Sequence, residues 1–240
     1  MNEILLPLLA FITSALTAVT GIGGGMILIA CMPGLLPGSA IVPVHGMVQL
    51  FANSSRAFFG WQFLRWDFLL AFIAGALIGG LMAAAITQEI NLEYTPLLIA
   101  AYILFSTWGP GLRLKQKSKG EFVIIGMLQT GLSMIVGATG PLGQASLLRH
   151  QLKRDALVVT AALMMTFTHM IKVILFALLG FAFLSYWKII LGMSLGVIAG
   201  AFIGTHIRYK IPEQHFKRIL KWLLTLLAFR MIYITLFPAA

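Results

Sequence analysis

Apolar residues run along the chain in long stretches that alternate with short polar breaks. A helix crosses a hydrocarbon layer of about 30 Å with about 20 residues, because each residue advances it by about 1.5 Å. The stretches of about this length are residues 4–20, 41–64, 67–86, 94–112, 121–136, 155–184, 187–207 and 216–236, and two pieces, 26–33 and 141–148, are too short to span. The pattern predicts an all-α polytopic membrane protein with about eight spanning helices and two re-entrant or broken half-helices.

Composition supports a protein in contact with a lipid bilayer. The chain has 240 residues, of which 60% are hydrophobic and only 10% are charged. A soluble domain carries roughly 25% charged residues, so these charges are too few to cover a soluble surface. The single cysteine, Cys31, cannot form a disulfide within the chain, which excludes a disulfide scaffold.

The net charge of +10 would suggest a nucleic-acid partner in a soluble protein. Here most basic residues fall in three short breaks between apolar stretches: Arg113, Lys115, Lys117 and Lys119; Arg149, Lys153 and Arg154; Arg208, Lys210, Lys217 and Arg218. This is the positive-inside pattern of membrane topology. We therefore expect basic loops on the cytoplasmic side and no nucleic-acid partner.

These basic breaks constrain the path of the chain, because an even number of crossings must separate any two of them. Only one long stretch lies between the first and second breaks, so the short piece 141–148 must bring the chain back. The sequence thus predicts a hairpin that returns partway through the membrane. The loop 87–93 has no Lys or Arg and fits the opposite side. Both termini are predicted outside, and the start of the chain has no basic segment typical of a cleaved signal peptide.

The two halves of the chain match at fixed offsets. At an offset of 116 residues, Gly21 and Gly24 match Gly137 and Gly140, and Asn53 and Arg56 match His169 and Lys172; at 121, Trp66, Gly75, Gly79 and Ile90 match Trp187, Gly196, Gly200 and Ile211. We interpret residues 1–112 as a first repeat, 113–120 as a basic cytoplasmic linker and 121–240 as a second repeat. Each half crosses an odd number of times, so the repeats are predicted to be inverted, as in many secondary transporters.

Two glycine-rich motifs mark the predicted breaks. Gly23, Gly24 and Gly25 precede one short apolar piece, and Thr139 and Gly140 precede the other. Unwound backbone is tolerated in a membrane only against protein or a water-filled cavity. Free amides at the following helix starts would favour an anion there. The alternative is a pair of tight re-entrant turns without a ligand.

A stripe of polar residues lies on the predicted helix 41–64. His45, Gln49, Asn53 and Arg56 follow spacings of 4, 4 and 3, so they share one face. The second half offers Thr168, His169 and Lys172 in its long stretch 155–184. A buried charge in a membrane usually faces a cavity or marks a transport pathway. Two alternatives remain: the Arg56 side chain extends to the lipid headgroups, and the Gln49 and Asn53 side-chain amides serve only to join neighbouring helices.

The positions of the acidic residues indicate the sign of the ligand. All of them lie at or near segment boundaries: Glu3, Asp67, Glu89, Glu93, Glu121, Asp155 and Glu213. A cation or proton site in the membrane usually uses Asp or Glu, so a small anion is the favoured substrate. The sequence offers no metal cluster, cofactor motif or catalytic pair, and we predict neither an enzyme nor a metal site. Lys221 and Arg230 either reach the membrane surface or contact a second copy in a homodimer.

With these motifs, the whole chain resembles the sulfite exporter TauE/SafE family of bacterial membrane permeases. The resemblance rests on Gly21 to Gly25, on the helix bearing His45, Gln49 and Asn53 to Arg56, and on a second copy opening at Gly137. It implies transport of sulfite, sulfonates or related anions across the bacterial inner membrane. Ala161 and Met165 stand where His45 and Gln49 are expected at the offset of 116, which favours one asymmetric site over two equivalent sites.

The sequence as a whole predicts a secondary transporter, in particular an exporter, of a small sulfur-containing anion such as sulfite or an organosulfonate. Its predicted site contains His45, Gln49, Asn53, Arg56, Thr168, His169 and Lys172, with Gly23, Gly24, Gly25, Thr139 and Gly140. Alternating access is expected from rocking of one repeat against the other. An anion channel and a non-transporting structural membrane subunit remain as alternatives.

Overall fold

A computed structural model describes residues 2–20, 23–89, 92–109, 118, 120–207 and 213–237. The first half of the chain forms α1 (Asn2–Thr20), α2 (Gly24–Cys31), α3 (Gly38–Phe59), α4 (Leu69–Thr87) and α5 (Thr95–Trp108). The second half forms α6 (Glu121–Val136), α7 (Gly140–Arg149), α8 (Arg154–Leu178), α9 (Trp187–Ile207) and α10 (Glu213–Leu236). These ranges contain no β-strand, as the all-α prediction requires. Most of the predicted linker 113–120, and Gly21, lie outside the described residues.

Two predicted segments end earlier in the structure than the apolar pattern suggests. The stretch 41–64 was expected to continue past Phe59, but Gly60 ends α3 and a 3₁₀ turn, Trp61–Phe63, follows. The stretch 155–184 stops as a helix at Leu178, and Gly180 adopts a φ of 88° two residues later. Glycine reaches this left-handed region at little steric cost. Hydrophobicity alone therefore overestimates both helices.

Among the described residues, four helical segments are by themselves long and apolar enough to cross a membrane. They are Trp66–Thr87, Arg154–Leu178, Phe183–Ile207 and Arg218–Leu236. Three further apolar helices are shorter: Ile4–Thr20, Thr95–Trp108 and Glu121–Val136. Helix α3 has 22 residues but carries the polar stripe. Large apolar side chains such as Leu70, Leu195 and Leu226 are exposed on the outer faces, as expected for a surface in contact with lipid.

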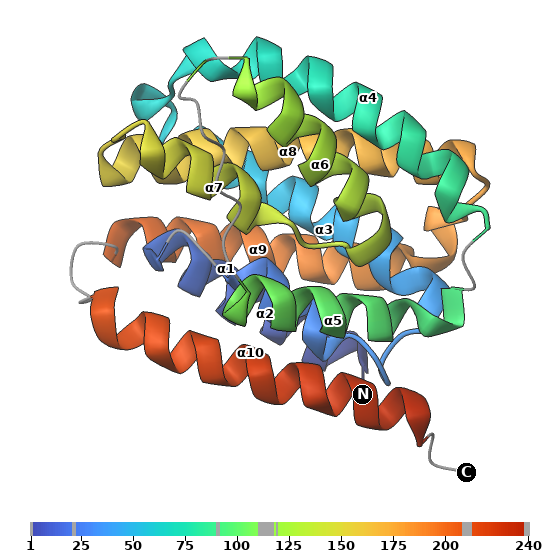
Figure 1. Cartoon of the computed structure of the whole chain (residues 1–240). Coiled ribbons are helices and arrows are strands. Elements are labelled where there is room, and N and C mark those ends of the chain that lie inside the picture. The colour runs from blue at the N-terminus through green and yellow to red at the C-terminus, as the bar shows by residue number, and fades with distance from the viewer. Residues whose placement is uncertain are drawn as a thin grey trace.

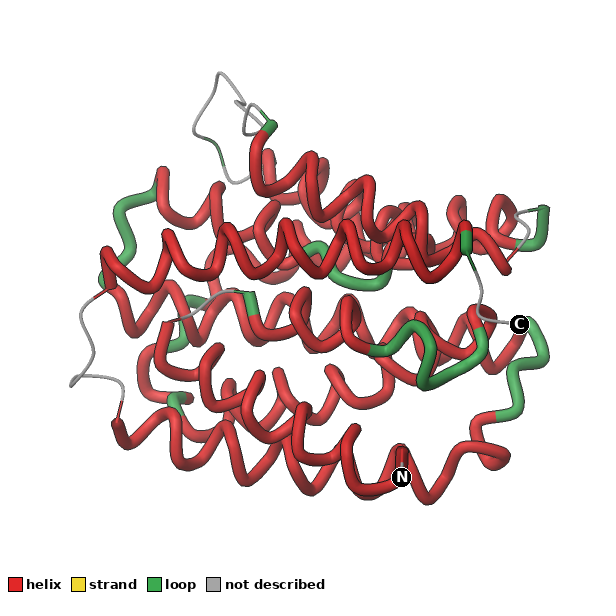
Figure 2. Tube along the Cα trace, turned by 90° about the horizontal axis from the view of Figure 1, so that it is seen from below, coloured by secondary structure: helices red, strands yellow, loops and turns green. Residues whose placement is uncertain are grey.

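The helices run side by side, with most connections at the two ends of the bundle (Figures 1 and 2). In Figure 1, α9 ends, and α8 and α10 begin, at the left end of the molecule, and α5 ends in the left half but short of that end; the N-terminus and the end of α10 lie to the right. Arg154 at the start of α8 donates to the Val19 carbonyl near the end of α1 at 2.8 Å. The helix ends flanking the second and third basic breaks therefore gather at the left end, those flanking the first lie in the same half, and the N-terminus and the end of α10 lie in the other half.

The closest helix pairs join one half of the chain to the other. Helix α4 packs along α6, and α1 packs along α9. A Cβ added at Gly75 or Gly79 would meet the backbone of Val123 or Met127, and one at Gly196 or Gly200 would meet the backbone of Pro7 or Phe11. The glycines of the two interfaces are 121 residues apart and their partners are 116 apart. The two interfaces are thus built from matching positions, and glycine is needed because backbone approaches backbone.

The hairpin of α6 and α7 returns to the end from which it starts. Glu121, the first residue of α6, accepts hydrogen bonds from Arg149 Nη2 at 2.6 Å and from His150 Nε2 at 3.1 Å. Arg149 ends α7, so these bonds join the two open ends of the hairpin. Gly137, with a φ of 79°, ends α6 and makes the turn between the helices possible. Sequence reasoning expected this return from the count of membrane crossings.

Candidate functional site

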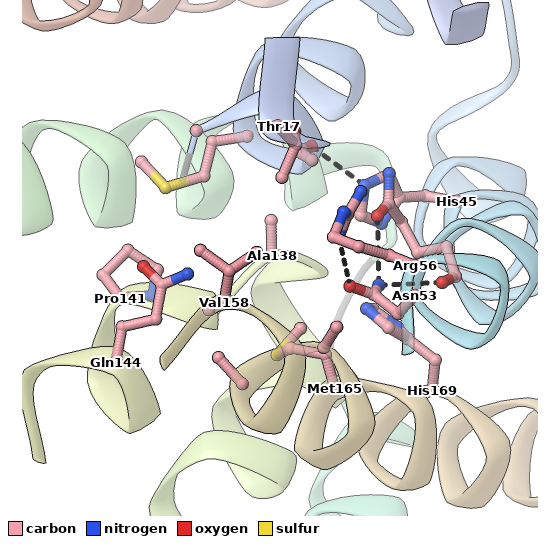
Figure 3. A pocket seen from close by; sticks show the side chains of 17 residues that line it. Thr17, His45, Asn53, Arg56, Ala138, Pro141, Gln144, Val158, Met165 and His169 are labelled. Atoms are coloured by element: carbon pink, nitrogen blue, oxygen red, sulfur yellow. Dashed lines mark hydrogen bonds between the residues drawn. The ribbon is translucent and has the colours of Figure 1, made fainter. Parts of the chain in front are cut away.

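A cavity of about 60 Å³ lies where α3 and α8 face each other, next to the starts of α2 and α7. Eight of the predicted residues line it: Gly23, Gly25, His45, Gln49, Asn53, Arg56, Gly140 and His169. Figure 3 shows Arg56, Asn53, His45 and His169 gathered on one side and Pro141, Gln144 and Val158 on the other. We call this space the central cavity. One wall is rich in hydrogen-bond donors, and the opposite wall is largely apolar.

The polar stripe of α3 forms a connected chain of hydrogen bonds. Asn53 Nδ2 donates to the Gln49 carbonyl at 2.8 Å and to Gln49 Oε1 at 3.3 Å. Asn53 Oδ1 accepts from Arg56 Nη1 at 2.9 Å. Arg56 is only 4% exposed, so it does not extend to the membrane surface as the alternative for this residue required. Asn53 orients the Arg56 guanidinium towards the cavity. Among the described residues, the hydrogen bonds of the Asn53 side chain are all to residues of α3.

Two histidines complete the polar wall. His45 Nε2 donates to the Gly25 carbonyl at 2.9 Å, which joins α3 to the start of α2. The His45 and His169 rings meet edge to face, with their centroids 5.9 Å apart. Within the described part of the chain, Nδ1 of each ring is buried and has no hydrogen-bond partner. The rings therefore retain bonding capacity that a ligand or water in the cavity can use.

The first glycine motif brings backbone donors to the central cavity. Gly23 adopts a φ of 95° immediately before α2, and Gly25 and Met26 line the cavity. The first amides of a helix have no partner inside that helix. Gly24 does not line the cavity; a Cβ there would meet Thr17 and the Thr13 carbonyl, so this glycine lets α2 approach α1. The start of α2 thus lies beside a cavity that also contains Arg56.

The second glycine motif offers fewer free donors than the sequence suggested. The amides from Leu142 onward were expected to face the cavity, but Leu142 N donates to the Thr139 carbonyl at 3.2 Å. Gly143 N donates to Gln129 Oε1 at 2.8 Å. Thr139 Oγ1 donates to the Gln129 carbonyl at 2.8 Å, so it holds the hairpin and does not line the cavity. The start of α7 is therefore largely satisfied by α6.

Lys172 is fully buried but does not line the central cavity. Its Nζ donates to the Gly137 carbonyl at 2.9 Å, to Ser133 Oγ at 3.1 Å and to the Ser133 carbonyl at 3.4 Å. These acceptors lie at the C-terminal end of α6, where the helix dipole favours a cation. Its stem passes α3 at Gly46, where a Cβ would lie 2.6 Å from Lys172 Cε. Lys172 thus secures the α6–α7 break from α8.

Several buried polar residues of the site region were not predicted from the sequence. Gln129 connects α6, α7 and α8: besides its bond to Gly143, its Nε2 donates to Met165 Sδ at 3.1 Å and to Thr168 Oγ1 at 3.4 Å. Thr168 is thereby placed beside the cavity and not in its wall. Thr17 and Gln144 line the cavity. The spacing of Gln129, Ser133 and Gly137 at four residues was the available signal, since these positions share a helical face.

The size and charge of the central cavity limit what it can hold. One water needs about 10–15 Å³ of such space, so about 60 Å³ accommodates a ligand of a few heavy atoms. Arg56 supplies a positive charge, and none of the described residues that line the cavity is Asp or Glu. No group of three or more potential metal ligands occurs among the described residues. The arrangement is suited to a small oxyanion, which accepts charge-assisted hydrogen bonds.

Comparison with known proteins agrees with this chemistry. The family model described as sulfite exporter TauE/SafE matches residues 6–231 of the chain. No match was found among curated proteins or among solved structures. The family match covers nearly all the described helices, including those that form the central cavity. The chain therefore belongs to the sulfite exporter TauE/SafE family.

Proposed function

We propose that the protein is a secondary carrier that exports a small sulfur-containing oxyanion, such as sulfite or a short organosulfonate. Membership in a family of anion transporters gives the class of activity. The observation that carries the proposal is the central cavity itself, which combines Arg56, two histidines and the start of α2 without a lining carboxylate. Lipid and a small anion are the expected partners.

The anion would bind between α2 and α3. Arg56 faces its oxygens from one side, oriented by Asn53 at 2.9 Å, and the amides at the start of α2 face them from the other. His169 has a buried ring nitrogen without a partner among the described residues. His45 already uses Nε2 as a donor to Gly25, so its Nδ1 donates to the anion only when the ring is protonated. Lys172 acts from a distance by keeping the α6–α7 break in place. Among the described residues, the Leu142 and Gly143 amides at the start of α7 already have acceptors, so one asymmetric site next to α2 is favoured over two equal ones.

We further propose that the halves are inverted repeats with the site between them, and that the basic breaks face the cytoplasm of a bacterial cell. The matching glycine interfaces support the repeat. In Figure 1, α1 and α6 run in opposite directions, as do α4 and α9. Alternating access would open the central cavity to one side at a time.

Anion uptake into proteoliposomes tests the proposal. Wild-type protein should show saturable uptake of radiolabelled sulfite under nitrogen, and Arg56→Gln should lower affinity by about 10- to 100-fold, because charge-assisted hydrogen bonds contribute about 1.5–3 kcal/mol. Arg56→Gln combined with Lys172→Gln should abolish uptake. Arg65→Gln is the matched control, since Arg65 is half exposed and pairs with Asp67 outside the cavity. Unchanged flux in a folded double variant would contradict the electrostatic basis of the proposal.

The same vesicles separate a carrier from the alternatives. A carrier loaded with unlabelled sulfite accelerates uptake of the labelled anion by counterflow, whereas a channel gives no such acceleration. A structural subunit neither transports the anion nor gains thermal stability when the anion is added.

A further inference from the structure

A second cavity adjoins the central cavity between α5 and α10. It has a volume of about 220 Å³ and shares three lining residues, Gly23, Met26 and Pro141, with the central cavity. We call it the outer cavity; Thr107 of α5 and Lys221 of α10 lie on its other walls. Because the same three residues line both spaces, a single layer of residues separates them. One of the three, Gly23, is covered by the Leu220 side chain, whose Cδ2 would lie 2.5 Å from a Cβ at that position.

The ammonium of Lys221 has no acceptor in the outer cavity. Its Nζ lies 3.7 Å from the centre of the Trp108 ring, and it makes no hydrogen bond or ion pair among the described residues. Trp108 is held in place by its Nε1, which donates to Thr225 Oγ1 at 2.9 Å. An ammonium carries three donors, and a ring face satisfies at most part of this capacity. Lys221 is thus fixed in position with donors available to a ligand.

A second unused polar group lies in the same wall. Thr107 Oγ1 is buried and has no hydrogen-bond partner in the described part of the chain. Neither Asp nor Glu is among the described residues that line the outer cavity. The space therefore combines a cation, a free hydroxyl and the start of α2 with no anion to balance them. A small oxyanion supplies the missing charge and the missing acceptors.

The position of the outer cavity relates it to a transport route. Helix α10 begins at Glu213, at the left end of the bundle in Figure 1, and α5 ends at Trp108 in the same half, beside Lys221. Clustered positive charge raises the local concentration of anions. An anion that enters the central cavity through the outer cavity passes Lys221 on its way to Arg56.

We propose that the outer cavity is a binding station for the transported oxyanion, held by the Lys221 ammonium and the Thr107 hydroxyl, on the way to the central cavity. This inference rests on the proposed function. A lipid phosphate offers the same chemistry to Lys221, so the experiment must distinguish a free anion from a headgroup.

Sulfite uptake from the side of the basic loops tests the station. In neutral phosphatidylcholine vesicles, Lys221→Gln should raise the half-saturation concentration roughly tenfold, the loss of one charge-assisted contact, with an unchanged maximal rate. Lys221→Arg should restore it, and Thr107→Val should give a smaller rise. Lys188→Gln is the matched control: Lys188 also lies over a tryptophan ring, Trp187 at 5.9 Å, but lines neither cavity.

Each outcome has a distinct meaning. If the wild-type protein takes up sulfite and both Lys221→Gln and Thr107→Val have the wild-type half-saturation concentration, the station is overturned and the proposed function stands. An effect of Lys221→Gln that appears only when anionic phosphatidylglycerol is added assigns the cavity to lipid and also overturns the station. Absence of saturable uptake by the wild-type protein refutes the proposed function and the station together.

Discussion

Arg56 and Lys172 occupy matching positions in the two halves but have different surroundings. Arg56 lines the central cavity and is oriented by Asn53. Lys172 donates to the end of α6 through three hydrogen bonds. The offset of 116 residues identifies Arg56 and Lys172 as equivalent positions in the two halves. Whether each charge faces the cavity or the backbone depends on the atoms that surround it. One cation therefore lines the central cavity, and the other is bonded to the end of α6.

This difference gives a prediction for Lys172. Replacing it with Met removes three hydrogen bonds from a charged donor, and such bonds contribute about 1.5–3 kcal/mol each. The Gly137 carbonyl keeps the Ser133 hydroxyl as donor, and the Ser133 carbonyl keeps the Gly137 amide. We expect a clearly lower thermal unfolding temperature in detergent, and a smaller loss of sulfite affinity than Arg56→Met causes. Calorimetric binding measured well below the unfolding temperature checks both. A Lys172→Met protein of wild-type stability that no longer binds sulfite would place Lys172 in the binding site.

At the residue scale, the sequence predicted the polar stripe well and the second half of the site less well. The spacing of His45, Gln49, Asn53 and Arg56 placed them on one face, and all four line the central cavity. Helical periodicity carries that information directly. The role of Gln129 could not be predicted, because it depends on how closely α6 approaches Gly143, a contact between residues of different helices.

At the scale of helices, the glycine interfaces determine how closely the two halves pack. Gly79 meets the backbone of Met127, and Gly200 meets that of Phe11. Neither contact leaves room for a side chain, and the obstructing atoms belong to backbone that cannot rotate away. Sequence reasoning identified these glycines as packing positions, but it could not pair α4 with α6 or α1 with α9.

Substituting these glycines should destabilise the protein by similar amounts. Gly79→Leu and Gly200→Leu force the helices apart, and overpacking costs about 1–3 kcal/mol even when side chains can adjust; we expect a loss at or above the upper end. Thermal unfolding in detergent measures it. Ala85→Leu, on the exposed face of α4, is the control and should change little. If Gly79→Leu destabilised the protein and Gly200→Leu did not, the two interfaces would not be equivalent.

For the whole molecule, the positions of the basic residues along the chain predict which end of the bundle faces the cytoplasm. In a Cys31→Ser background, Ser118→Cys and Gln88→Cys place single thiols at exposed positions near opposite ends of the bundle. We expect an impermeant maleimide to label position 118 only in inverted membrane vesicles and position 88 only in right-side-out vesicles, because positive loops remain in the cytoplasm. Labelling of both positions from the same side would refute the topology.

The architecture as a whole was predictable in outline. The apolar stretches gave all ten helices of the described chain, and the count of crossings gave the return of the α6–α7 hairpin. Helix ends were less accurate, since Gly60 and Gly180 end helices inside apolar sequence. The sequence could not predict which helices of the two halves pack together. Hydropathy indicates that a residue is buried but not which helix covers it.

The crossed packing of the halves has a mechanical consequence. If the first half slid past the second as one block, both glycine interfaces would have to separate. Movement of α1, α9 and α3 against α4, α6 and α8 would keep both glycine interfaces and change the packing of α3 on α8. The bends would then fall at 60–68 and 179–186, the two connections that join these two groups of helices. Such a protein would turn on hinges inside each half, opening and closing the groove between α3 and α8 in which Arg56 lies.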